Sequence, residues 1–250
     1  MDIKENNNLA TNITRHFWEI ARLKIIQKII TDKIDTPQSV IDIGCGDCFV
    51  LQSLSQQYPN THFIGIDTAL TDKMIDDINK STDNKKISIH RKLHTNQINK
   101  ADLVLMLDVL EHIEDEENFL RSLHKIMHQD TKIIITVPAF QKLFTYHDQY
   151  LKHFRRYNRK QLVNMLEKSE FKVTISGYFF CSLLPFRIIQ KLRHIKTSPE
   201  NNLHVSNIFI NNILAILLYM DAIISYALSS KKIYIPGLSC FAVAELKSNN

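Results

Sequence analysis

Hydrophobic and polar positions divide the chain into two kinds of alternating segment. Short runs of apolar and β-branched residues predict strands, and longer segments with apolar residues at helical spacing predict amphipathic helices. The predicted strands are Val40–Ile43, His62–Asp67, Ile87–His90, Ala101–Asp108, Lys132–Val137, Phe171–Phe179 and Cys240–Leu246. The predicted helices are residues 11–31, Cys48–Tyr58, Leu70–Ile78, Asp115–His128 and Asn158–Ser169. This alternation predicts an α/β fold with a doubly wound, mainly parallel sheet.

Two segments are too long to be simple connections. One is the loop 138–157, and the other is the stretch 179–238, which precedes the last strand. We therefore expect a core formed by residues 1–178 and 239–250, with residues 179–238 as a helical insertion in the same domain.

The insertion contains two predicted helices. Residues 185–195 form a basic amphipathic helix with Pro185 at its start, a type that can lie on an anionic membrane surface. Residues 208–228 are strongly apolar, but Asp221 is costly inside a bilayer, so we expect a buried or interfacial helix rather than a span. A helical cap packed on the sheet is the alternative.

Composition narrows the class of protein. The formal net charge of +5 is mild and does not by itself indicate a nucleic-acid-binding protein. The first residues are polar and resemble no signal peptide, and four cysteines make no disulfide framework. We therefore expect a cytoplasmic protein, with the inner membrane surface as its potential contact.

Glycine is scarce, with five in 250 residues, yet Gly44 and Gly46 both follow the first strand. A turn of this kind lets a ligand approach the backbone closely. Phe49 occupies the third position of the Gly-x-Gly-x-x-Gly dinucleotide pattern, which argues against NAD and FAD. Asp67 ends the next strand, where a carboxylate accepts hydrogen bonds from a ribose diol.

These segments resemble a known family. VIDIGCGDCF, FIGID and LMLDVLEHIED look like the first three motifs of the class I S-adenosylmethionine-dependent methyltransferases. RHFWEIAR, TVPAFQKLFTYHDQYLKHFRRYNRKQL and PGLSCFAVAE resemble a bacterial methyltransferase type 11/23 group, so the resemblance covers nearly the whole chain. It implies a Rossmann-like sheet of seven strands with an antiparallel last strand, and S-adenosylmethionine as cofactor.

The resemblance also implies a cofactor site. Gly44, Cys45 and Gly46 would line the methionine part, Asp67 would hold the ribose and Leu107 would lie at the ligand. Arg22 is similar to an arginine that meets the cofactor carboxylate in ubiquinone-pathway O-methyltransferases. The predicted cofactor-binding residues are Arg22, Asp42, Gly44, Cys45, Gly46, Asp67, Leu107 and Asp108.

Two motifs beside this site have alternative interpretations. Cys45-x-x-Cys48 has redox spacing, but the partner features of a thioredoxin are missing, so we favour a structural role. Asp108-x-x-Glu111-His112 resembles the Glu-x-x-Glu-His of some metal-dependent relatives, or else forms a helical capping box. Two carboxylates and one imidazole are half a hard-cation shell, and we predict no metal.

The loop after the fifth strand carries the candidate chemistry. A hydroxyl acceptor must lose its proton, and histidine is the usual base. His147 paired with Asp148 is the first candidate, and His153 is the second. Arg155, Arg156 and Tyr157 are the predicted acceptor-binding residues, since paired arginines suit an anionic group. The alternative is a solvated basic loop with structural salt bridges.

The predicted function is S-adenosylmethionine-dependent methyl transfer to a small or lipid-like acceptor, at oxygen. The alternative is a non-catalytic S-adenosylmethionine-binding module. RNA methylation is disfavoured because the chain has no basic tail, so we expect no nucleic-acid partner. An antiparallel last strand must begin at the cofactor edge, so we expect residues 179–238 to form a lid over an apolar acceptor pocket.

Overall fold

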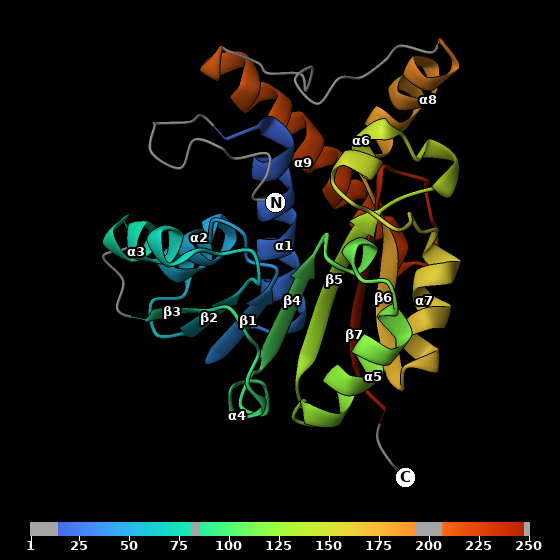
Figure 1. The fold of residues 1–250 in the computed structure, drawn as a ribbon. Helices are drawn as coiled ribbons and strands as arrows, with labels where there is room; N and C mark the ends of the chain where they lie inside the picture. Colours follow the sequence, from blue (N-terminus) through green and yellow to red (C-terminus); the bar gives the residue numbers. More distant parts are fainter. Residues whose placement is uncertain (1–14, 82–85, 194–206, 248–250) are drawn as a thin grey trace.

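A computed structural model describes residues 15–81, 86–193 and 207–247 of the chain. Its centre is a seven-stranded sheet in the order β3-β2-β1-β4-β5-β7-β6 (Figure 1). The strands are β1 Ser39–Ile43, β2 His62–Ile66, β3 Ile87–His90, β4 Leu103–Leu107, β5 Lys132–Pro138, β6 Phe171–Phe179 and β7 Ser239–Leu246. Within the described ranges, β7 alone pairs antiparallel, with β5 on one side and β6 on the other. The predicted doubly wound α/β fold with an antiparallel last strand is confirmed.

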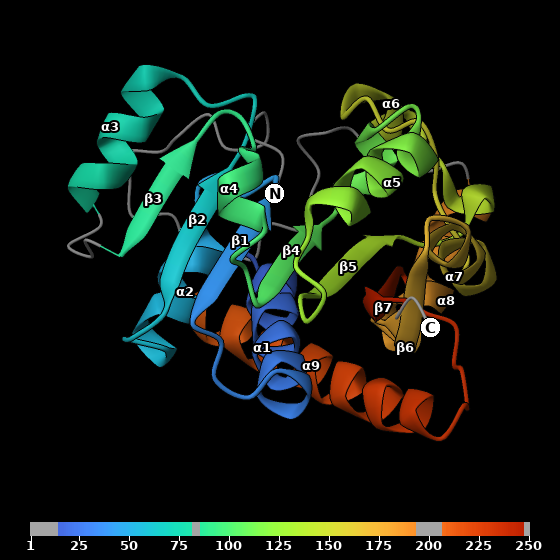
Figure 2. The same ribbon diagram turned by 90° about the horizontal axis from the view of Figure 1, so that it is seen from below.

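Helices cover both faces of the sheet (Figure 2). One face is covered by α1 Phe17–Lys33, α2 Phe49–Gln57, α3 Asp72–Ser81 and α9 Ile208–Ser230. The other is covered by α4 Thr95–Ile98, α5 Glu116–Ile126 and α7 Arg159–Lys168. Side chains alternate along β4, with Leu103 and Leu105 in the first core and Val104 in the second. This burial on both faces explains the continuous apolar run in the sequence.

Most predicted boundaries agree with the structure to within two residues. The capping box of α7 is confirmed, because the side chains of Asn158 and Gln161 each accept the other's backbone N–H at 2.9 Å. The strand predicted from Ala101 begins at Leu103 instead. Asp102, just before it, still bonds to both neighbouring strands, since its N–H donates to Ser39 O and its carbonyl accepts the Lys132 N–H, both at 3.0 Å. Its carboxylate also accepts the backbone N–H groups of Gln38 and Ser39. Residues 11–14 of the first predicted helix and 194–195 of the basic helix lie outside the described residues.

The sequence did not predict two short helices, α4 and α6 Tyr146–Tyr150. Each is held by a capping box rather than by a long apolar stripe. Three 3-10 turns, η2 Leu110–His112, η3 Gln141–Leu143 and η4 Cys181–Leu183, follow strand ends.

The carboxyl ends of the parallel strands gather the predicted site residues at one edge of the sheet. Since β7 begins opposite Pro138 and Phe179, residues 180–238 leave and return at that edge. Helix α8 Leu184–Leu192 stays there, next to η3. Helix α9 instead packs beside α1 and across β6 (Figure 2). The insertion is therefore divided between the edge and one face, and its role as a lid stays a prediction.

Candidate functional site

The turn after β1 is built around Gly44. Its backbone N–H donates to Ile66 O at 2.7 Å, which joins the turn to the end of β2. Gly44 has φ +77°, and a Cβ there would lie 2.5 Å from Val109 Cγ2. Glycine is therefore required both by the backbone conformation and by the close approach of the chain after β4. Gly46 also has positive φ, at +56°.

Asp67 fixes the other side of this turn. Its carboxylate accepts the backbone N–H of Gly46 at 3.1 Å and that of Ala69 at 2.9 Å. The side chain is half-buried. A carboxylate has about four lone-pair sites, so two backbone bonds leave acceptor capacity for ribose hydroxyls. The predicted glycine turn and its acid are thus brought together by direct hydrogen bonds.

The two cysteines of the turn form a buried, hydrogen-bonded pair. Cys48 donates to Cys45 Sγ at 3.6 Å, and neither cysteine is in a disulfide. The hydrogen bond from Cys48, together with burial, raises the pKa of the Cys45 thiol far above its usual range. Because the thiolate is the reactive form, this environment favours the structural interpretation over redox chemistry.

Arg22 joins α1 to the end of β4. Its guanidinium is buried, forms a salt bridge with Asp108 and lies 4.8 Å from the ring centroid of Trp18. Asp108 has φ +57° and also accepts from Thr136 Oγ1 at 3.1 Å. Leu107, beside it, is part of the core on the α1 face. Arg22 and Asp108 therefore act in the structure as one ion pair at the predicted cofactor edge.

Asp42 lies on β1, directly before the glycine turn. Its side chain is 2% exposed, and its Oδ1 has no hydrogen-bond partner among the described residues. Burial raises the pKa of Asp42 to about 7. A buried polar atom without a partner costs about 1–3 kcal/mol, so this position can gain from a ligand that donates to it.

A second group of side chains centres on Asp148 in α6. Its buried carboxylate accepts from His153 Nδ1 at 3.0 Å and from Arg156 Nε at 2.7 Å. It also accepts the backbone N–H of Thr145 at 2.8 Å, which completes the cap of α6. Burial alone would raise the pKa of Asp148, but the hydrogen bonds from His153 and Arg156 outweigh it and hold the pKa well below its usual range.

His153, the second candidate base, is held directly against the Asp148 carboxylate. The loop that follows α6 turns back and brings its imidazole there. His147, the first candidate, directly precedes Asp148 in α6 and is half-buried. Its role as a base stays a prediction.

The predicted acceptor-binding residues, Arg155, Arg156 and Tyr157, stabilise the loop after α6 through contacts with other parts of the protein. Arg155 forms an ion pair with Glu116 and donates to Glu114 O at 2.7 Å. Arg156 is bound to Asp148, and the buried hydroxyl of Tyr157 donates to Leu110 O at 3.2 Å. An acceptor anion would have to compete with these partners. The geometry corresponds to the alternative of structural salt bridges that the sequence left open.

Glu111, His112 and His153 form a compact group that we name the Glu111 cluster. Each offers one potential ligand atom, and these atoms lie within 4.8 Å of one another. Glu111 is fully buried, and neither carboxylate oxygen has a hydrogen-bond partner within the described part of the chain. Burial, followed by the nearby charge of Asp108, raises the pKa of Glu111 well above its usual range.

The cluster excludes the capping-box interpretation of this motif. The Asp108 side chain is bound to Arg22 and Thr136, and the Glu111 carboxylate makes no capping bond among the described residues. The three side chains could hold a divalent cation, although three donors make only half of its usual shell. The sequence placed Glu111 at the site but gave no signal that its carboxylate would be unpaired.

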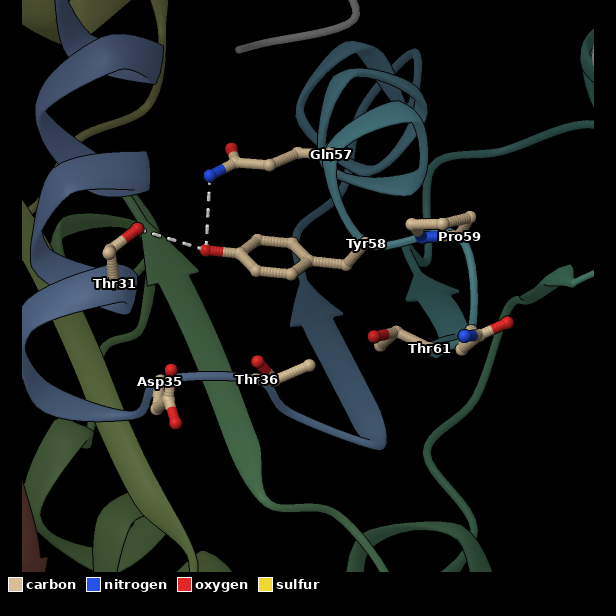
Figure 3. A pocket seen from close by; sticks show the side chains of 8 residues that line it. Thr31, Asp35, Thr36, Gln57, Tyr58, Pro59 and Thr61 are labelled. Atoms are coloured by element: carbon tan, nitrogen blue, oxygen red, sulfur yellow. Dashed lines mark hydrogen bonds between the residues drawn. The ribbon is translucent and has the colours of Figure 1, made fainter.

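One surface pocket lies away from all of these groups. It is formed where α1 ends and where α2 turns into β2, and Thr31 and Gln57 both contact the Tyr58 hydroxyl at 3.2 Å (Figure 3). Thr36 and Thr61 of this pocket precede β1 and β2. The pocket therefore lies at the amino ends of the strands, opposite Gly44 and Asp67.

A family model described as "Methyltransferase domain" matches residues 15–175, which include the glycine turn, Asp67 and the Asp148 loop. The chain belongs to this methyltransferase domain family. The fold and the family are those of enzymes that use S-adenosylmethionine, as the sequence motifs predicted.

A curated relative is "N-methyltransferase 4" of Papaver somniferum, which is 22% identical over 124 residues. The match covers 48% of this chain and 35% of that protein, so it spans little more than a third of the relative.

Solved structures share the fold at low sequence identity. Coclaurine N-methyltransferase, titled as bound to N-methylheliamine and SAH, is 13% identical with a TM-score of 0.58, covering 91% of this chain and 70% of that one. The methyltransferase domain of bacterial CtHen1-C is 16% identical with a TM-score of 0.54, covering 92% and 99%. The [4+2]-cyclase SpnF is 11% identical with a TM-score of 0.58, covering 95% and 85%. Because a cyclase is among them, the fold alone does not define the reaction of this chain.

Proposed function

We propose that this protein transfers a methyl group from S-adenosylmethionine to an oxygen of a small or lipid-like acceptor, with His153 as the base. The observation that carries the proposal is the hydrogen bond between His153 and the buried carboxylate of Asp148. A histidine held in this way has one ring nitrogen fixed as a donor, which leaves the other as a proton acceptor. The pair follows β5, at the edge where parallel sheets bind ligands.

The cofactor side of the proposal rests on the glycine turn and its acid. Gly44 leaves no room for a Cβ, and Asp67 has acceptor capacity beyond its two backbone bonds. These residues fit the methionine and ribose parts of the cofactor. Arg22 is held at the same edge of the sheet by its ion pair with Asp108, which follows β4. When bound, the cofactor supplies a methyl group on a positively charged sulfur.

The Asp148–His153 pair supports oxygen as the methylated atom. An acceptor hydroxyl that attacks the methyl carbon loses its proton to His153 as the oxygen–carbon bond forms and the carbon–sulfur bond breaks. The anionic Asp148 then stabilises the protonated imidazole. A neutral amine can attack without such a base, so the acid–base pair supports oxygen rather than the nitrogen methylation that the names of two relatives describe.

Exposed aromatic side chains on the same segment support an apolar acceptor. Tyr146 and Tyr150 on α6 and Phe154 in the following loop are all solvent-exposed. They flank Asp148 and His153 in sequence. An acceptor with apolar surface would cover these rings while its hydroxyl approaches the base.

The decisive experiment supplies tritiated-methyl S-adenosylmethionine to the protein with a cell extract and identifies the labelled product. We expect His153→Ala to reduce transfer about 100-fold or more while affinity for S-adenosylhomocysteine stays within twofold. His128→Ala, at an exposed position after α5, is the matched control. Cofactor binding without any transfer would favour the non-catalytic module, and a product labelled at nitrogen would contradict the oxygen assignment.

A further inference from the structure

Helix α9 buries three polar side chains, those of Asn211, Ser225 and Ser229. Its buried residues are Asn211, Ala215, Leu218, Ala222, Ser225, Tyr226 and Ser229. Asn211 Nδ2 donates to Arg15 O at 2.9 Å, and Ser225 Oγ donates to Tyr178 O at 2.6 Å. At Gly177 the helix and β6 are so close that a Cβ would lie 2.1 Å from Ser229 Oγ. Small residues and hydrogen bonds therefore hold α9 against α1 and the sheet.

The outer face of α9 is more apolar than the inner one. Its exposed residues at spacings of three and four are Phe209, Ile213, Ile216, Leu217, Met220 and Ile224. We name these residues the α9 outer stripe. Phe209 is 70% exposed and Leu217 is 61% exposed. A surface helix of a soluble protein normally shows the opposite pattern, with its apolar stripe toward the core.

Helix α8 repeats this inverted arrangement at the carboxyl edge. Phe186, Ile189 and Leu192 are exposed, and Leu192 reaches 74%. Lys191 at the end of α8 is exposed, and its Nζ donates to the carbonyl oxygens of Lys142 and Phe144, which joins the helix to the segment around η3. Helices α8 and α9 thus both present apolar side chains to the solvent.

The charges around these helices are mainly basic. Between Ala139 and Lys160 the sole acid is Asp148, which is buried and paired with Arg156. Lys142 and Lys152 of that segment are exposed, as is Arg193 after α8. Lys231 and Lys232 follow α9. Basic groups next to exposed aliphatic and aromatic residues match the two components of an anionic lipid surface, headgroup charge and acyl chains.

We propose that α8 and the α9 outer stripe form a docking surface for an anionic lipid bilayer. Apart from the exposed Asn212, the exposed side chains of α9 from Phe209 to Ile224 are Phe, Ile, Leu and Met, whereas protein interfaces of ordinary size carry about one hydrogen bond per 100–200 Å². An aliphatic stripe with basic flanks therefore suits lipid better than a second protein.

The docking is peripheral. Helix α9 is the one helix among the described residues that is long and apolar enough to cross a membrane, and 28% of its most apolar window is buried in the protein. A spanning orientation would break the hydrogen bonds of Asn211 and Ser225. It would also place Asp221, whose carboxylate accepts from Ser182 Oγ at 3.1 Å, in the hydrocarbon of the bilayer. A helix of 23 residues, about 34 Å long, can instead lie in the interface with one face immersed.

Sedimentation of the full chain with vesicles tests the proposal. The probes are vesicles of phosphatidylcholine with about one third phosphatidylserine, and vesicles of phosphatidylcholine alone. We expect the protein to sediment with the anionic vesicles at low salt and to bind the neutral vesicles more weakly. We expect Leu217→Glu and Leu192→Glu each to lower the partition coefficient about tenfold or more, since each removes a buried leucine side chain from the lipid phase.

Matched variants separate this effect from misfolding and from charge alone. Leu217→Phe keeps the stripe apolar and is expected to retain binding. Gln56→Glu adds a negative charge at an exposed position of α2 and is expected to leave partitioning unchanged. Affinity for S-adenosylhomocysteine, which should stay constant in all variants, checks the fold independently of vesicle binding.

Three outcomes would overturn the docking surface. In the first, the protein stays in the supernatant with anionic vesicles at low salt. In the second, neither glutamate variant changes vesicle binding. In the third, light scattering shows a dimer that Leu217→Glu dissociates. None of them bears on methyl transfer, which is measured separately with the labelled cofactor.

Discussion

Replacement of Asp67 by alanine should weaken cofactor binding by a predictable amount. The carboxylate accepts two backbone N–H groups, from Gly46 and Ala69, and has capacity for the ribose hydroxyls. A hydrogen bond to a charged group contributes about 1.5–3 kcal/mol. Water replaces part of what Asp67→Ala removes, so we expect a net loss of ~1–3 kcal/mol, which corresponds to a rise of roughly 5- to 150-fold in Kd.

Isothermal titration with S-adenosylhomocysteine measures this loss directly. Asp67→Asn keeps the shape and one carbonyl oxygen, so its Kd should lie between those of the parent and Asp67→Ala. Asp72→Ala removes an exposed carboxylate that pairs with Arg91 on the surface, and it should leave the Kd unchanged. Thermal melting without ligand shows how much of the effect comes from the loosened glycine turn. A Kd for Asp67→Ala within twofold of the parent would refute the ribose assignment.

Three further perturbations test other parts of the site. Gly44→Ala should lower the melting temperature and weaken cofactor binding at least tenfold, because the added Cβ would lie 2.5 Å from Val109 Cγ2. Adding Val109→Ala should restore part of both losses. If it does not, the loss comes from the strained backbone conformation at Gly44 instead. The pKa of Asp42 is raised to about 7, so the folded state binds this proton more tightly than the unfolded chain does. The free energy of unfolding, measured in urea, should therefore fall by up to roughly 4 kcal/mol as pH rises from about 4 to 7. Asp42→Asn should flatten that slope, and an unchanged slope would assign it to other groups. Methyl transfer should survive a chelator; loss of activity that manganese restores would instead place a cation in the Glu111 cluster.

The sequence determined the strands, the glycine turn and the order of the main helices. Buried strands such as β4 show as continuous apolar runs, because both of their faces lie against helices. The cap of α7 was equally local, since Asn158 and Gln161 are three residues apart. The short helices α4 and α6 were not predicted, because helices of four and five residues are too short to show a periodic pattern of apolar positions.

Only the tertiary structure decided which side chains meet. Adjacency suggested His147 for Asp148, and only the fold shows that the following loop also brings His153 to that carboxylate. The carboxylate partners of Arg155 and Arg22 lie on distant segments, so no local pattern could show those ion pairs. The partner of Arg156 is Asp148 in the same loop, but the turn of that loop brings them together. The outward direction of the α9 outer stripe was likewise decided by packing, because hydrogen bonds from polar residues fix the opposite face against α1 and β6. The composition of α9 determined its apolar character, and its contacts with α1 and β6 determined which face remained exposed.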